Sequence, residues 1–164
     1  MTATDNANLP TADVPQGAIA YRDLGEGGPI VFVHGLLVDG RLWSGVAERL
    51  ASEFRCLVAD WPMGSHRTAM RPDADLAPPG MAQIVVAFMD ALGIERATLV
   101  GNDTGGAISQ IVTAHHPDRV ERLVLTNTSS YFADKTAWND RLRLVRDCRA
   151  QDRDRLFGVF RIVV

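Results

Sequence analysis

The sequence has no excess of basic residues, no long hydrophobic run and almost no cysteine. Its 164 residues carry 17 Lys and Arg against 20 Asp and Glu, so we expect no surface for nucleic acid. No uncharged run could span a bilayer, and the run at residues 76–89 is broken by proline and glycine, so no membrane association is expected. Cys56 and Cys148 lack metal-ligand or CxxC spacing, which predicts no metal site. The polar N-terminus lacks the pattern of a signal peptide, and we expect a cytoplasmic protein.

Apolar runs alternate with helical patterns along the chain. The pattern predicts an edge strand at 18–23, further strands at 29–35, 54–60, 97–103 and 122–127, and helices at 41–52, 81–92 and 104–116. Residues 1–16 are expected to be a flexible tail, and residues 61–80 a long loop. The alternation predicts an α/β fold, a mostly parallel sheet with helices on both faces.

Polar residues follow the predicted strands, at the edge of the sheet where such folds collect their chemistry. The stretch Gly-Asn-Asp-Thr-Gly at 101–105 has the form of a nucleophile elbow, a sharp strand-to-helix turn, with Asp103 at the position of the nucleophile. Aspartate is also a good helix N-cap, and glycine is common in such turns, so the pentapeptide alone leaves both interpretations open.

The strand "VFVHG" supplies a second signal, because it ends in His34 and Gly35. In an elbow fold, one oxyanion-hole N–H follows the nucleophile and the other lies in the loop after this strand. These positions correspond to the backbones of Thr104 and Leu36, while His34 in the same loop is expected to have a structural role.

The stretches "VFVHG", "VADWPMGSHR", "LVGNDTGG" and "HPDRVERLVLTN" together resemble the α/β-hydrolase superfamily, and within it the aspartate-nucleophile branch of epoxide hydrolases and haloalkane dehalogenases. The resemblance implies a hydrolase core at 17–128 and the beginning of a helical cap at 129–164. It implies that Asp103 attacks carbon in a small-molecule substrate and forms a covalent ester, with no cofactor. We expect an epoxide or ester-like substrate, with haloalkane dehalogenase as the alternative.

Two differences from the aspartate-nucleophile branch favour an epoxide or ester-like substrate over a haloalkane. Many of these enzymes have Trp after the nucleophile to hold a halide, where this chain has Thr104. Dehalogenases often have Asn after the His-Gly pair, where this chain has Leu36, so both halide donors are missing.

No histidine follows His116, although the resemblance implies a late histidine and a supporting acid. His66 could face the site, whereas His115 and His116 are expected at the far end of a helix. We therefore expect that the chain stops within the cap, and whether 164 residues suffice for turnover stays open.

Four aromatic residues are candidates for the substrate pocket: Trp61, Tyr131, Phe132 and Trp138. They are equally compatible with a role in the core. Two other classes remain to be compared. A dinucleotide-binding protein is disfavoured because no stretch fits G-x-G-x-x-G, while a non-catalytic, ligand-binding relative is compatible with the missing histidine.

Overall fold

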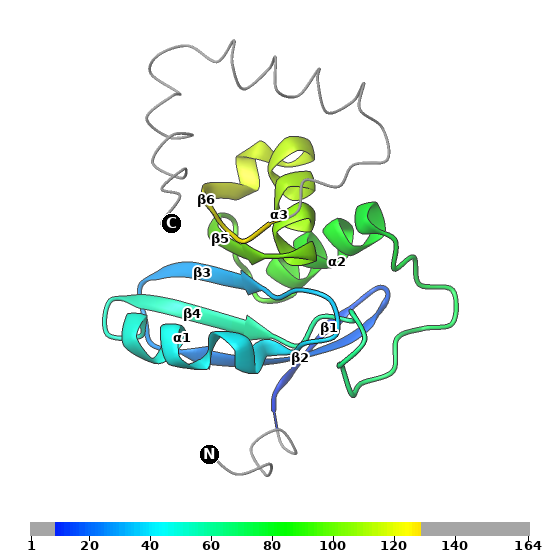
Figure 1. Cartoon of the computed structure of the whole chain (residues 1–164), viewed down its shortest axis with the longest axis horizontal. Helices are drawn as coiled ribbons and strands as arrows, with labels where there is room; N and C mark the ends of the chain where they lie inside the picture. The colour runs from blue at the N-terminus through cyan, green and yellow to red at the C-terminus, as the bar shows by residue number, and fades with distance from the viewer. Residues whose placement is uncertain (1–8, 129–164) are drawn as a thin grey trace.

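The computed structural model describes residues 9–128, which form a six-stranded sheet flanked by helices (Figure 1). The elements are β1 (Thr11–Val14), β2 (Gly17–Leu24), β3 (Gly28–Val33), the 3-10 helix η1 (Gly40–Trp43), α1 (Ser44–Leu50), β4 (Phe54–Ala59), α2 (Pro78–Ala91), β5 (Ala97–Asn102), α3 (Thr104–His115), the 3-10 helix η2 (Pro117–Arg119) and β6 (Val120–Thr126). The strands lie side by side in the order β1-β2-β4-β3-β5-β6. Strands β4, β3, β5 and β6 are parallel, while β2 pairs antiparallel with β1 and β4. The predicted α/β class with a mostly parallel sheet is confirmed.

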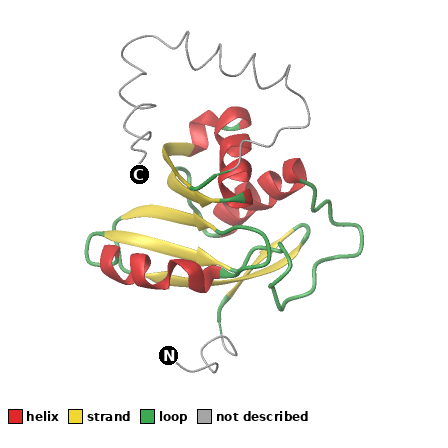
Figure 2. Cartoon of the chain, in the orientation of Figure 1, coloured by secondary structure: helices red, strands yellow, loops and turns green. Residues whose placement is uncertain are grey.

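Helices cover both faces of the sheet because the central strands are apolar on both sides. In β3, Val31 and Val33 belong to the cluster that includes the buried side of α2 and α3. Ile30 and Phe32 alternate with them and belong to the opposite cluster, together with Trp43. Accordingly, α1 lies on one face of the sheet, and α2 and α3 lie on the other (Figure 2).

Two predictions about the N-terminal part are wrong. The flexible tail predicted at residues 1–16 is wrong for residues 11–14, which form β1, while residues 1–8 lie outside the described residues. The strand predicted at 18–23 is therefore not an edge strand, because β2 lies between β1 and β4. Ala12 and Val14 are buried in the same cluster as α2, and this burial stabilises a strand of only four residues.

The parallel register brings the carboxyl ends of four strands to one edge of the sheet. Val33 lies opposite Gly101, and Asn102 lies opposite Thr126. The loop at residues 60–77 starts at the same edge, directly after β4 (Figure 2). The polar residues that follow β3, β4, β5 and β6 therefore gather in one region. None of the described helices is long and apolar enough to cross a lipid bilayer.

Candidate active site

Asp103 occupies a sharp turn between β5 and α3. Its backbone has φ 50° and ψ −126°, a conformation that is unfavourable for residues other than glycine. The other described non-glycine residues with positive φ are Leu37, after β3, and Asn127, after β6. All three lie at the carboxyl edge of the sheet, so the backbone strain of the described chain is concentrated at this edge.

Small neighbours make this turn possible. A Cβ atom on Gly101 would lie 2.5 Å from the Cα of Gly106, so the strand and helix could not approach each other with a larger residue there. A Cβ atom on Gly35 would lie 2.7 Å from Oδ2 of Asp103. The loop after β3 can therefore reach the carboxylate only because residue 35 is glycine.

The carboxylate of Asp103 does not cap the helix that it precedes. The structure contains no side-chain cap hydrogen bond at the start of α3. Oδ2 instead accepts hydrogen bonds from the backbone N–H of Leu36, at 3.4 Å, and from the hydroxyl of Thr104, at 3.2 Å. Among residues 9–128, no hydrogen bond to the other oxygen, Oδ1, is present. The positive end of α3 favours a negative charge at this position.

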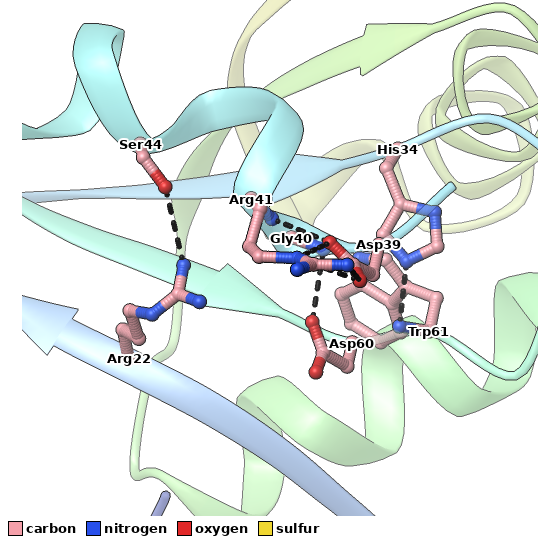
Figure 3. Close-up of polar contacts among 8 residues, drawn as sticks. All are labelled: Arg22, His34, Asp39, Gly40, Arg41, Ser44, Asp60 and Trp61. Atoms are coloured by element: carbon pink, nitrogen blue, oxygen red, sulfur yellow. Dashed lines mark hydrogen bonds and ion pairs between the residues drawn. The ribbon is translucent and has the colours of Figure 1, made fainter. Parts of the chain in front are cut away.

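His34 is fully buried and connects two loops (Figure 3). Its Nε2 accepts from the N–H of Trp61 at 2.9 Å, and its Nδ1 lies 2.8 Å from the carbonyl oxygen of Gly35. These partners require a neutral ring that is protonated on Nδ1. Burial lowers the pKa of His34, which is opposed by its hydrogen bond to Gly35 and by the charge of Asp60. These two hydrogen bonds connect the loop after β3 to the residue that follows Asp60, with His34 as a neutral group.

Further hydrogen bonds fix the backbone of the loop after β3 (Figure 3). The N–H of Leu37 donates to the carbonyl of Met63 at 2.9 Å, and the N–H of Gly40 donates to Oδ1 of Asp60 at 2.9 Å. Asp39 forms an ion pair with Arg41 at 2.7 Å. Hydrogen bonding to Arg41 lowers the pKa of the Asp39 carboxyl.

The predicted substrate-binding role of Trp61 needs correction. Its side chain is fully buried, its indole N–H donates to the carbonyl of Phe32 at 2.8 Å, and its ring packs edge-on against Phe88. Trp61 therefore belongs to the core rather than to a surface that a substrate could contact. The other aromatic candidates, Tyr131, Phe132 and Trp138, lie outside the described residues.

None of the described histidines forms a hydrogen bond or ion pair with the side chain of Asp103. His66 follows β4, and its Nδ1 is enclosed with no hydrogen-bond partner within residues 9–128. His115 ends α3, roughly 16 Å along the helix axis from Thr104 at 1.5 Å per residue. His116 lies beside Gln83, with 3.3 Å between the side-chain nitrogens. Within residues 9–128, no group of three or more His, Cys, Asp or Glu residues is arranged to hold a metal ion.

Sequence reasoning overlooked the side chain of Thr104, which was considered only for its backbone N–H. The relevant signal was present in the sequence, because a hydroxyl directly after an aspartate in a tight turn can reach that carboxylate.

This combination of a parallel sheet, a strained strand-to-helix turn and a facing backbone N–H is typical of hydrolases that use a nucleophile elbow. The family model described as "alpha/beta hydrolase fold" matches residues 28–156. The chain belongs to the α/β-hydrolase fold family.

Curated relatives of the chain are named for different activities. The chain is 33% identical over 125 residues to haloalkane dehalogenase 2 of Mycobacterium tuberculosis (strain ATCC 25618 / H37Rv), covering 76% of this chain and 43% of the relative. It is also 33% identical over 124 residues to the putative carbamate hydrolase RutD of Caulobacter sp. (strain K31), covering 72% and 44%. The chain thus spans less than half the length of these curated relatives.

Solved structures with the same fold include enzymes of several kinds. A hydrolase from Pseudomonas aeruginosa PA01 superposes with a TM-score of 0.68 at 26% identity, covering 88% of this chain and 55% of that one. A structure described as novel epoxide hydrolases from metagenomes of hot environments superposes with a TM-score of 0.68 at 27% identity, covering 74% and 42%. The fold is therefore shared by proteins with different named activities, and it does not by itself determine the reaction.

Proposed function

We propose that the chain provides the nucleophile and the oxyanion hole of a hydrolase that forms a covalent ester on Asp103, with an epoxide or ester-like small molecule as substrate. The observation that carries this proposal is the orientation of the Asp103 carboxylate, which leaves its own helix uncapped and meets the N–H of Leu36. A carboxylate that served only as a cap would instead bond the free N–H groups of the first helical turn.

The chemistry follows from the ionisation of a carboxylate at neutral pH. A carboxylate attacks carbon directly and needs no base to remove a proton first. One carboxylate oxygen forms a bond to an epoxide carbon while the ring C–O bond breaks. The ring oxygen keeps the electron pair and takes a proton from water. Water then hydrolyses the ester, regenerating the carboxylate and releasing a diol, with the N–H groups of Leu36 and Thr104 stabilising the negative charge of the intermediate.

Haloalkane dehalogenation is the second candidate, favoured by the similarity to haloalkane dehalogenase 2. It ranks lower because the site offers no side-chain N–H for a halide at residues 36 and 104, which are leucine and threonine. A non-catalytic, ligand-binding relative is the third candidate.

Covalent labelling of the purified chain tests the nucleophile. The chain is incubated separately with styrene oxide, 1-bromohexane and 4-nitrophenyl acetate, and adducts are located by intact mass and peptide mapping. We expect a single adduct from styrene oxide on Asp103. Asp103→Asn should prevent it without changing the circular dichroism spectrum, while Asp118→Asn, which alters an exposed carboxylate beyond α3, should label normally.

Each result separates the candidates. Faster labelling by 1-bromohexane with bromide release would favour the dehalogenase. Equal labelling of Asp103→Asn and the wild type would refute the assignment of Asp103 as the nucleophile. The absence of an adduct with any of the three probes would favour the non-catalytic, ligand-binding relative.

A further inference from the structure

Two hydrogen-bond donors meet at the same oxygen of Asp103. Leu36 contributes a backbone N–H at 3.4 Å, and Thr104 contributes its side-chain hydroxyl at 3.2 Å, both to Oδ2. Among the described residues, the Thr104 hydroxyl makes no other hydrogen bond. The two oxygens of the carboxylate are therefore not equivalent, since Oδ1 lacks donors within this part of the chain.

We propose that the Thr104 hydroxyl is a third donor of the oxyanion hole, in addition to the N–H groups of Leu36 and Thr104, and that it assigns the two carboxylate oxygens to different tasks. This inference rests on the proposed function. Oδ1, which has the freer lone pairs, attacks the substrate and becomes the bridging oxygen of the ester. Oδ2 becomes the carbonyl oxygen of that ester and faces the donors.

The second step gives the hydroxyl its effect. When hydroxide adds to Cγ of the ester, the electron pair of the carbonyl moves onto Oδ2, which then carries a full negative charge. As the intermediate collapses, the carbonyl re-forms and the bond from Cγ to Oδ1 breaks. Oδ1 leaves as the oxygen of the alcohol, which takes a proton from water, and the hydroxide oxygen takes its place in the regenerated carboxyl group. A donor at Oδ2 is strengthened as this charge develops, so it accelerates hydrolysis of the ester.

The first step has the opposite requirement. In the free carboxylate, the Thr104 hydroxyl already stabilises charge on Oδ2, and this charge decreases as the ester forms. Removing the hydroxyl should therefore leave alkylation unchanged or slightly faster, while it slows ester hydrolysis. A residue that only supported the fold would affect both steps in the same direction.

The experiment measures the lifetime of the ester, and it needs no catalytic histidine because hydroxide supplies the nucleophile. The chain is alkylated with styrene oxide, excess reagent is removed, and the loss of the adduct is followed by intact mass at several alkaline pH values. Wild type is compared with Thr104→Val, which has the same shape without the hydroxyl, and with Thr104→Ser, which retains a hydroxyl. Thr113→Val is the matched control, because Thr113 lies in the same helix and its hydroxyl donates to the carbonyl of Ser109.

We expect Thr104→Val to lose the adduct about tenfold more slowly than wild type, below the 10²–10³ typical of a buried oxyanion donor because this site is partly exposed. Alkylation of Thr104→Val should be at least as fast as in wild type, and Thr104→Ser and Thr113→Val should match wild type in both steps. Equal ester lifetimes in wild type and Thr104→Val would refute the role of the Thr104 hydroxyl as a third donor, without affecting the assignment of Asp103 as the nucleophile. Slower alkylation of Thr104→Val would assign it a structural role instead. Absence of any adduct on wild-type Asp103 would refute the proposed function itself.

Discussion

We predict that the protein loses stability at mildly acidic pH, because His34 is buried as a neutral group. Its ring is fully buried, and Nε2 accepts a hydrogen bond from the N–H of Trp61. Protonation of Nε2 would make it a donor, so that two N–H groups would face each other and this hydrogen bond would be lost. His34→Gln is the informative substitution, because the glutamine amide oxygen can accept the same N–H but does not titrate.

The sign and size follow from proton linkage. Burial lowers the pKa of folded His34, whereas in the unfolded chain a histidine titrates near about 6.5. Between these two pKa values the unfolded state binds the extra proton, so the free energy of unfolding falls as pH falls. The contribution of His34 is complete above about pH 6.5 and is lost below it by about 1.4 kcal/mol per pH unit, for as long as the folded ring stays neutral. The carboxyl of Asp39, whose pKa is lowered by Arg41, affects stability only below about pH 4.

Urea unfolding at several pH values measures this loss of stability, with the fluorescence of the buried Trp43 and Trp61 as the signal. Wild type should lose up to about 1 kcal/mol between about pH 6.5 and 5.5, because the slope reaches its full value only below the unfolded pKa. His34→Gln should show a flat profile over this range, even with lower stability at neutral pH. The control is His116→Gln, which alters a histidine on the surface beside Gln83 and should retain the wild-type profile. A profile of equal slope in wild type and His34→Gln would refute the neutral, anchoring role of His34.

Two further substitutions test the packing around the site. Gly35→Ala places a methyl group 2.7 Å from Oδ2 of Asp103. Covalent labelling of Asp103 by styrene oxide should therefore slow at least about tenfold. Labelling at the wild-type rate would show that the loop can move away. Phe88→Ala removes a fully buried ring that packs edge-on against Tyr21 and Trp61, and urea unfolding should show a loss of about 3–5 kcal/mol; a loss below about 1 kcal/mol would mean that the core refills the space.

The parts of the fold that the sequence predicted are those in which one physical signal dominates. Continuous apolar runs identified β3, β4 and β5, because strands buried on both faces have few polar positions. Strand β1 was missed because four residues next to proline and glycine give too short a pattern to separate from a turn. Its alternation of exposed and buried residues becomes meaningful only once β2 and α2 are in place.

The site was predictable at the level of backbone spacing and not at the level of side-chain direction. Glycines at fixed distances around Asp103 indicated the turn, and the His-Gly pair indicated the facing loop. The sequence could not decide whether the carboxylate caps α3 or faces Leu36, because both geometries use the same residues. It likewise could not show that Trp61 points into the core, since an aromatic residue after a strand fits either side of the sheet.

In the loop after β3, the groups that hold the backbone in place differ from the residues that are exposed. Its shape depends on His34 and on the backbone N–H groups of Leu37 and Gly40, all bonded to residues that follow β4. Leu36, Leu37 and Val38 are 55%, 73% and 39% exposed. The hydrogen bonds that hold this loop therefore do not depend on the side chains at positions 36 and 38, so substitutions there can change the exposed surface of the loop without removing those hydrogen bonds.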